Sequence, residues 1–391
     1  MHIVEMARGG SFPALPEPIR ECCFMAKKTK FIDITKKGAG PTRRTFLVTS
    51  GATIAAAAAT SGPLIIVPGK AKAAERVVFA TWGGQLQESL TEAYIKPFTK
   101  DTGIEVVVTG APDMAKITAQ VKAGDVETDI ADLAGSYVVP GDKNGLWEPV
   151  NTKIVDRSNV LDPKFNRANQ QGYYTYAGGV GYSEERNPGN KHPSNWAEFW
   201  DVKKFPGRRG LRSRPGETLE VALMADGVPG SKVYPIDVER AFKALDRIKP
   251  NVSHWIAETP KTVTLIQGNE TDFTYAYNGR VYFANREGAK LGWAGDQAYI
   301  APNWISVVQK ARNKEAAFKF MNSLLNPERQ AHFAKLMTYS PVVKGADKFI
   351  SPEVKKLLPD PLNPNSCFEN VDWWGDKNEE LTKRFKEWQM V

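Results

Sequence analysis

The chain has 391 residues, with 52 Lys and Arg against 44 Asp and Glu, and a formal net charge of +8. Residues 1–73 hold 11 of these basic residues and 4 of the acidic ones, so residues 74–391 carry a net charge of only +1. A nearly neutral chain gives no electrostatic reason to bind nucleic acid or an anionic membrane. The length after residue 73 is sufficient for two lobes, each with its own core.

An export signal is the first recognisable pattern. Arg43 and Arg44 stand side by side before Phe46, an alanine-rich apolar run follows, and Ala71-Lys72-Ala73 forms an A-x-A cleavage pattern. The paired arginines resemble the twin-arginine signal. A transmembrane anchor is the alternative, but polar residues and glycines dilute the apolar run. We predict a leader over 1–73, cleaved near Ala73, and a mature protein in the periplasm.

The cysteines and the start methionine both bear on the predicted leader. The cysteines are Cys22, Cys23 and Cys367, and only Cys367 follows the predicted cleavage site. The mature chain then forms no internal disulfide, and no cysteine stands where a lipid anchor would be attached. Met25 is followed by three lysines within five residues, which is a normal basic start for such a signal. We therefore predict Met25 as the true start.

Strands and helices alternate from residue 76 onward. A β-prone run over 76–82 predicts a buried first strand that ends in a glycine turn, and apolar residues at helical spacing predict a helix over 85–99. Strands are predicted over 104–108 and 129–133, with a helix over 114–121 between them. This alternation favours an α/β fold with a largely parallel sheet.

The second half of the chain continues the α/β pattern. An uncharged aromatic and glycine run over 173–182 predicts a strand that crosses between lobes, and 304–308 predicts the strand that returns. A basic stretch over 203–214 is interpreted as a solvated turn. The remaining predicted elements are helices over 219–225, 238–248, 262–267, 279–286, 313–325, 327–336 and 378–388, and a strand over 272–277.

The sequence gives little indication of catalysis or of cofactor binding. The histidines after the leader, His192, His254 and His332, lack metal-ligand spacing, and the glycine run over 178–181 lacks the G-x-G-x-x-G pattern of a nucleotide loop. There is no G-x-S-x-G nucleophile motif either. We predict no catalytic residues, no metal and no cofactor.

Aromatic residues at predicted strand ends are more informative. Trp82, Tyr137, Tyr277 and Tyr339 each lie where an apolar strand ends or in a glycine or serine turn. Ligands of α/β sheets bind beyond the carboxyl ends of strands, and aromatic faces suit apolar stems and cations. Each aromatic taken alone is better explained by core packing. Together they favour a cleft.

Several motifs resemble one family in the same order along the chain. The family is the spermidine/putrescine-binding group of periplasmic substrate-binding proteins of ABC importers, and the resemblance covers nearly all of 74–391. The motifs are Trp82-Gly83-Gly84, the run over 99–106, the run over 194–200, Tyr277-Asn278-Gly279, the run over 313–317 and the run over 351–354.

The resemblance implies a fold and partners. It implies a two-lobed, type II-like periplasmic-binding-protein fold with a ligand cleft between the lobes. The expected N-terminal lobe comprises 74–180 and 302–346, and the C-terminal lobe 181–301 and 347–391. It also implies a monomer that delivers a small solute to the membrane permease and ATPase of an ABC importer, with no chemistry on the ligand.

The same resemblance implies the ligand-binding residues. It carries over Trp82 as a stacking residue, Tyr277 and Tyr339 as aromatic walls, and Glu217 as the carboxylate that holds an ammonium group. Two positions depart from the family, since Arg214 and Asn303 replace acids. The complete predicted set is Trp82, Gly83, Ser136, Tyr137, Arg214, Glu217, Tyr277, Asn303 and Tyr339.

These departures leave the ligand open between two classes. A polyamine or similar amine is one, but a diamine needs an anion at each end. A zwitterion such as an amino-acid conjugate, opine or betaine is the other, because Arg grips a carboxylate bidentately. Arg214 is equally well explained as the end of the basic surface run. An exported enzyme is the rival from another class, since twin-arginine export often carries cofactor-loaded proteins.

Overall fold

The computed structural model describes residues 75–391. The predictions on the leader, which concern 1–73, the start at Met25 and the cleavage near Ala73, lie outside the described residues. No helix in the described part of the chain is long and apolar enough to cross a membrane.

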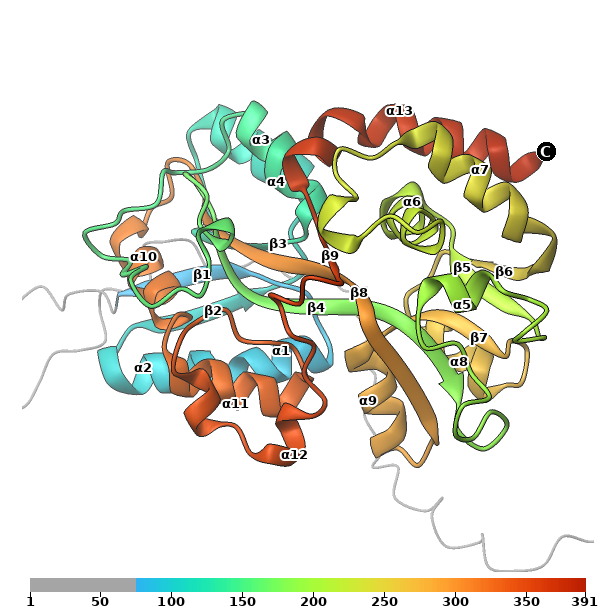
Figure 1. The fold of residues 1–391 in the computed structure, drawn as a ribbon. Helices are drawn as coiled ribbons and strands as arrows, with labels where there is room; N and C mark the ends of the chain where they lie inside the picture. The colour runs from blue at the N-terminus through green and yellow to red at the C-terminus, as the bar shows by residue number, and fades with distance from the viewer. Residues whose placement is uncertain (1–74) are drawn as a thin grey trace, which may run out of the picture. The chain divides into compact units, whose positions relative to one another are not determined.

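In the described part of the chain, nine strands form one mixed sheet (Figure 1). The strand order is β2-β1-β3-β8-β4-β7-β5-β6, and β9 pairs with β8 beside this path. The strands are β1 (Arg76–Ala80), β2 (Glu105–Thr109), β3 (Ile130–Leu133), β4 (Gln171–Ser183), β5 (Arg209–Arg212), β6 (Val252–Ile256), β7 (Phe273–Tyr277), β8 (Leu291–Val307) and β9 (Cys367–Phe368).

The two longest strands, β4 and β8, run through both halves of the sheet. They pair antiparallel with each other from Gln171↔Ile305 to Ser183↔Leu291. At one end β8 also pairs with β3, and at the other β4 pairs with β7. The crossing strands predicted from the sequence are therefore present, but β8 is far longer than the predicted 304–308. The reason is that its first half contains glycines, Asp296 and Gln297 and is exposed or half-buried over 293–297, which hides it from a hydrophobicity pattern.

Two large hydrophobic cores lie along these crossing strands. The first core draws on residues between Val77 and Tyr174 and between Trp304 and Ala346, together with Val371. The second core draws on residues between Val180 and Ala301 and between Cys367 and Phe385. Cys367 is fully buried in the second core, and burial raises the pKa of its thiol well above the usual range.

Helices cover the sheet beside each core. The predicted first helix is continuous in the structure but contains one π-helical turn, at which Tyr94 and its neighbours are buried. The helices beside the first core are α1 (Gln85–Leu90), the π-helical η1 (Thr91–Ile95), α2 (Lys96–Thr102), α3 (Met114–Ala123), α4 (Gly135–Lys143), the short η2 (Pro163–Phe165), α10 (Lys314–Ser323), α11 (Pro327–Met337), η5 (Ala346–Phe349) and α12 (Pro352–Lys355).

The longest helix in the described part of the chain, α13 (Val371–Met390), packs against the second core. Its apolar face, with Leu381 and Phe385, packs where α6 and α7 also lie (Figure 1). The other helices in this half of the sheet are α5 (Trp196–Trp200), α6 (Pro215–Ala225), η3 (Gly230–Lys232), α7 (Val238–Ile248), η4 (Lys249–Asn251), α8 (Lys261–Gln267) and α9 (Asn278–Arg286).

The basic stretch over 203–214 is only in part the solvated turn that the sequence predicted: 203–208 form a mostly exposed turn, but the stretch then enters the sheet. It contains β5, in which Arg209 and Arg212 are fully buried. The Arg209 guanidinium donates to the backbone carbonyls of Phe199 and Gly207. The Arg212 side chain lies 3.4 Å from the Glu217 carboxylate. For Arg209 and Arg212 the prediction was wrong, because carbonyl and carboxylate partners make burial of these charges tolerable.

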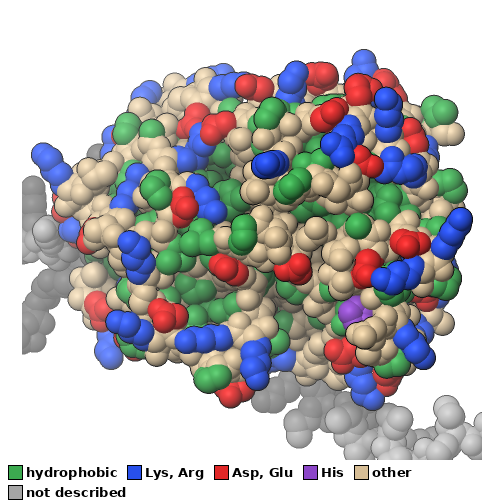
Figure 2. Space-filling model, in the orientation of Figure 1, with side chains coloured by type: hydrophobic (Ala, Val, Ile, Leu, Met, Phe, Trp, Pro, Cys, Tyr) green, Lys and Arg blue, Asp and Glu red, His purple; other side chains and the backbone are tan. Residues whose placement is uncertain are grey.

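Charged side chains lie interspersed on the face drawn in Figure 2, with Lys and Arg beside Asp and Glu. Several of these form surface ion pairs, such as Arg384 with Glu239 and Lys290 with Glu185. This mixed surface agrees with the near-neutral charge of residues 74–391.

Candidate ligand-binding site

A cavity of about 420 Å³, here called the cleft cavity, lies where β1 and β7 end and beside the middle of the crossing strands. Its volume is within the range of small-molecule sites. Six of the nine predicted site residues line it: Trp82, Gly83, Arg214, Tyr277, Asn303 and Tyr339. Residues from both cores therefore contribute to a single cavity.

The first side of the cavity, the Trp82 wall, consists of Trp82, Gly83 and Asn303. Trp82 follows β1, and the Tyr137 ring stacks behind it with ring centroids 6.0 Å apart. Tyr137 does not line the cavity, and neither does Ser136, which is exposed in the first turn of α4. Tyr137 instead supports the indole that forms the wall.

A buried carboxyl group, Asp132, stands behind the Trp82 wall. It accepts hydrogen bonds from the Thr81 hydroxyl at 2.8 Å and from the Asn303 side-chain amide. Burial raises the pKa of Asp132 to about 7, and the hydrogen bonds from Thr81, Tyr173 and Asn303 oppose this rise. All of these partners are neutral, so none compensates a full negative charge.

Aromatic rings from the crossing strands form the back of the cavity. Tyr174 and Tyr176 alternate along β4 and therefore face the same side of the sheet. Tyr174 stacks on Tyr339 with centroids 5.2 Å apart, and Tyr176 meets Tyr277 edge to face at 6.0 Å. With Trp82, these rings offer several π-faces to one small volume.

The opposite side, the Arg214 wall, consists of Arg214 and Tyr277. The Arg214 side chain is 48% exposed, and its Nη2 lies 2.7 Å from Oε1 of Glu217. The same nitrogen donates to the Tyr277 hydroxyl at 2.8 Å. The adjacent Glu217 carboxylate raises the pKa of Arg214 above its usual range. The guanidinium is thus held by two partners while part of it faces the cavity.

Glu217 lies behind the Arg214 wall and does not line the cavity. Its side chain is only 5% exposed, because Arg212, Arg214 and the Tyr277 hydroxyl enclose the carboxylate. The predicted pair of Arg214 and Glu217 is therefore present. A direct contact between Glu217 and a ligand ammonium group, however, would require these partners to move.

The local backbone conformation explains the position of the Arg214–Glu217 pair. Arg214 is the N-cap of α6, Pro215 occupies the first turn, and Glu217 has a φ of 72°. A positive φ is unfavourable for Glu, by about 1–3 kcal/mol. This turn directs the carboxylate back toward Arg214 instead of along the helix. The strain is located where the site needs a fixed charge pair.

Sequence reasoning missed several lining side chains, among them Tyr174, Tyr176, Thr259 and Arg280. The alternation of Tyr174 and Tyr176 was visible within the predicted crossing strand, and Arg280 directly follows the Tyr277-Asn278-Gly279 motif. Thr259 carried no signal. Within the described residues, no group of three His, Cys, Asp or Glu could hold a metal ion.

Comparisons with known proteins identify the family of the chain. Residues 93–359 match the family described as bacterial extracellular solute-binding protein. The chain is 33% identical to the γ-aminobutyric acid-binding protein of Pseudomonas aeruginosa over 79% of this chain and 89% of that protein. It is 25% identical to the spermidine/putrescine-binding periplasmic protein of Escherichia coli K12, over 74% and 84% of the two chains.

Solved structures agree with the predicted fold. An ABC transporter substrate-binding protein from Bradyrhizobium japonicum is 32% identical, with a TM-score of 0.75 over 80% of this chain and 99% of that one. A binding protein from Agrobacterium tumefaciens R10, solved in complex with agropinic acid, is 28% identical, with a TM-score of 0.67 over 81% and 99%. The prediction of a two-lobed α/β periplasmic-binding-protein fold is confirmed.

Proposed function

We propose that this chain, which belongs to the family of bacterial extracellular solute-binding proteins, captures a small zwitterion that carries an ammonium group and a carboxylate. It is the solute-binding component of an ABC transporter, so its partners are a small molecule and the permease and ATPase of that transporter. The family resemblance read from the sequence is therefore confirmed, while the ligand is our inference.

One observation carries the choice of ligand. Two arginines, Arg214 and Arg280, line the cleft cavity, and no Asp or Glu is found among the described residues that line it. A diamine would bring two positive charges to this surface without an anion to receive either. A carboxylate, in contrast, meets a guanidinium whose position Glu217 and Tyr277 already fix.

The ammonium end has its own surroundings. Trp82, Tyr174, Tyr176 and Tyr339 present aromatic rings, which attract an ammonium group through their π-faces. Asn303 donates its side-chain N–H to Asp132, which leaves its carbonyl oxygen as an acceptor. We assign the amine to this side and the carboxylate to Arg214.

The relatives support both ligand classes that the sequence left open. The relative that shares 33% identity is named for γ-aminobutyric acid, which has one amine and one carboxyl group, and the relative at 25% is named for polyamines. The complex with agropinic acid adds an opine-like ligand. The charge of the cavity favours the zwitterion over the polyamine.

Isothermal titration calorimetry of the purified protein tests the proposal. The panel is γ-aminobutyrate, glycine betaine, agropinic acid, putrescine and spermidine. We expect one of the carboxylate-bearing compounds to bind at least tenfold more tightly than either polyamine. Tight binding of spermidine with no measurable binding of the carboxylates would show an ordinary polyamine receptor instead.

Export and organisation complete the proposal. We propose a twin-arginine leader that begins at Met25 and is cleaved near Ala73, and a monomeric periplasmic protein. N-terminal sequencing of the exported protein tests the cleavage, and Lys at both Arg43 and Arg44 should stop export by this route. The composition of the two cores supports lobes of 74–180 with 302–346 and of 181–301 with 347–391.

A further inference from the structure

A second cavity, here called the rear cavity, has a volume of about 580 Å³. It is lined by Trp304 and Ile300 of β8, whereas Asn303 of the same strand lines the cleft cavity. Successive side chains of a strand point to opposite faces of the sheet. The two cavities therefore lie on opposite sides of the crossing strands. Figure 1 shows α9, near the cleft cavity, below these strands and the start of α13 above them.

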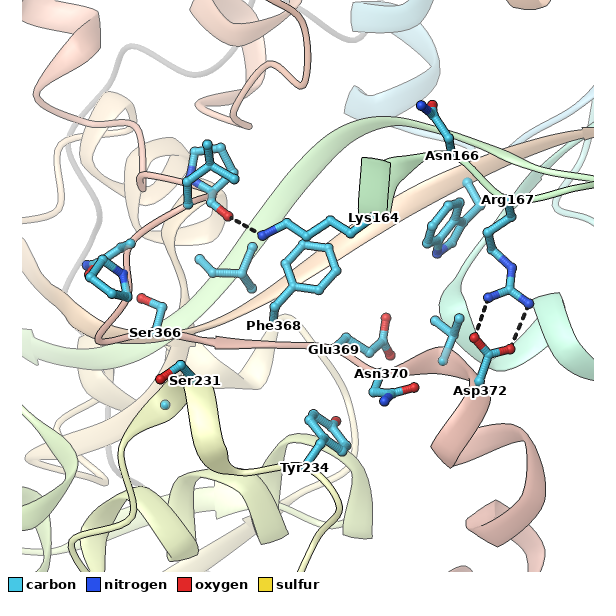
Figure 3. Close-up of a pocket in the computed structure, with 18 residues that line it drawn as sticks. Lys164, Asn166, Arg167, Ser231, Tyr234, Ser366, Phe368, Glu369, Asn370 and Asp372 are labelled. Carbon is cyan, nitrogen blue, oxygen red and sulfur yellow. Dashed lines mark hydrogen bonds and ion pairs between the residues drawn. The ribbon is translucent and has the colours of Figure 1, made fainter. Parts of the chain in front are cut away.

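The walls of the rear cavity come from segments far apart in the chain. Figure 3 shows Lys164 and Arg167 from the turn before β4, Tyr234 after η3, and Phe368 and Glu369 from the segment that leads into α13. The lining combines aromatic and polar side chains, as is usual for a site that takes a small organic molecule.

Two features make the lining rich in hydrogen-bond donors. The indole nitrogen of Trp304 is buried and has no hydrogen-bond partner among the described residues. Buried N–H groups are normally paired, so an orphan beside a cavity points to a missing partner. Lys164 donates to the carbonyl of Pro361 at 3.3 Å, and its ammonium group retains further donors.

Of the other charged groups of the lining, Glu369 is the one whose ionisation would oppose an anion, and its Oε2 is buried without a hydrogen-bond partner among the described residues. Arg167 and Asp372 form a bidentate pair at 2.7 and 2.8 Å, which neutralises both. Burial raises the pKa of Glu369 to about 8, with the negative charges of Glu220 and Glu217 adding to the rise and the Tyr299 hydrogen bond and Arg214 opposing it. Glu369 is therefore mostly protonated at pH 7. Among the described residues of the lining, Lys164 is the cation without a carboxylate within hydrogen-bond distance, although Asp162 and Asp360 lie near enough to act on its charge.

We propose that the rear cavity is a second binding site, for a small organic carboxylate with an apolar body. The carboxylate accepts from Lys164 and from the Trp304 indole N–H, and the apolar body packs against Phe368 and Tyr234. Lys164 already lies 4.1 Å from the centroid of the Phe368 ring, so charge and ring are adjacent. The proposed second site is independent of the cleft cavity and its ligand.

The test is a titration of ¹⁵N-labelled protein with sodium benzoate, followed by the tryptophan indole resonances. Benzoate should shift the Trp304 indole N–H in a saturable manner, with the resonance assigned from Trp304→Phe. The indole of Trp147 is the internal control, because its nitrogen is also buried without a partner but does not line this cavity. The same titration is repeated with the Arg214→Ala variant, which lacks the arginine proposed to bind an anion in the cleft cavity.

Variant proteins and a ligand of opposite charge test the proposal further. Lys164→Met should weaken benzoate at least tenfold, whereas Lys122→Met, at an exposed position, should not. Glu369→Gln should preserve binding at pH 9, where ionisation of Glu369 weakens it in the unaltered protein. A Trp304 resonance that does not move, equal affinity after Lys164→Met, or a shift with benzylammonium in place of benzoate would overturn the proposal.

Discussion

Each wall of the cleft cavity has a buried carboxyl group behind it, but the two groups have different partners. Asp132, behind the Trp82 wall, is surrounded by neutral hydrogen-bond donors from Thr81 and Asn303. Glu217, behind the Arg214 wall, pairs with two guanidinium groups. The same kind of side chain thus supports a neutral aromatic wall on one side and a cationic wall on the other.

The difference shows that a site's charge is set by the layer behind it as much as by the residues that line it. Burial raises the pKa of Asp132 to about 7, because its neutral hydrogen-bond donors only partly offset the desolvation of the charged form, so the carboxyl is about half protonated at pH 7. Arginine partners keep a charged network at the surface, in which Arg214 can exchange one anion for another. A zwitterion matches these two walls at once.

Removal of Arg214 should have the largest effect. Arg214→Ala deletes the anion partner while Glu217 keeps Arg212 and the Tyr277 hydroxyl. We expect calorimetry to show a loss of about 3 kcal/mol, roughly 100-fold, for a carboxylate-bearing ligand, and unchanged or improved binding of putrescine.

Arg208 is the matched control for this experiment. It belongs to the same basic stretch but pairs with Asp272 and does not line the cavity. Equal losses after Arg208→Ala and Arg214→Ala would place Arg214 with the surface charges.

Removal of the opposite wall should have a smaller effect. Trp82→Ala deletes the aromatic face that receives the ammonium group, at a cost of about 1–3 kcal/mol of binding. Tyr137→Ala removes only the ring that stacks behind Trp82 and should cost less. Calorimetry of both variants checks this order, and a Tyr137 effect larger than that of Trp82 would contradict it.

The carboxyl behind the Trp82 wall predicts a pH dependence of stability. Because burial raises the pKa of Asp132 to about 7, the folded state binds this proton more tightly than the unfolded state. The resulting stability is complete below the unfolded pKa, near 4, and is lost as the pH rises through 7. Thermal unfolding should therefore occur roughly 5 °C lower at pH 8 than at pH 5.

Asp132→Asn separates this contribution from those of Glu220 and Glu369, whose pKa values burial raises in the same direction. The variant should show a smaller decline of melting temperature over the same pH range, and Glu287→Gln, at an exposed position, should show the full decline. Identical pH profiles for Asp132→Asn and the unaltered protein would refute the assignment.

Arg280 should give the smallest effect. It is exposed at the edge of the cavity and has no ion pair among the described residues, so its charge acts through solvent. Arg280→Ala should weaken a carboxylate ligand by less than about threefold, and 0.5 M NaCl should abolish the difference. A loss comparable to that of Arg214→Ala would mean that the ligand carries a second anion.

Two of the lining residues that sequence could predict, Trp82 and Tyr277, follow or end apolar strands. β1 and β7 run in opposite directions, and their carboxyl ends approach the cavity from the two halves of the sheet. Arg214 and Glu217 were expected as a pair from their spacing and the family resemblance. In the structure they are 2.7 Å apart.

What sequence could not predict depends on contacts between distant segments. Arg209 and Arg212 look like surface residues in a run of charges and glycine, yet carbonyls from Phe199 and Ala257 receive their guanidinium groups. Likewise, no local pattern indicates that Tyr277 and Arg212 close around Glu217. These partners meet only when the sheet assembles. A prediction from charge alone therefore placed both arginines at the surface.

The isolation of Cys367 has a practical consequence. It is the one cysteine in the described part of the chain, and its thiol is completely buried. After removal of a leader that contains Cys22 and Cys23, the protein surface would present no reactive thiol to a maleimide reagent. Replacement of the exposed, cavity-lining Gln85 by cysteine would then create a single attachment point for a fluorophore. The protein is in this respect already suited to become an optical sensor for its own ligand.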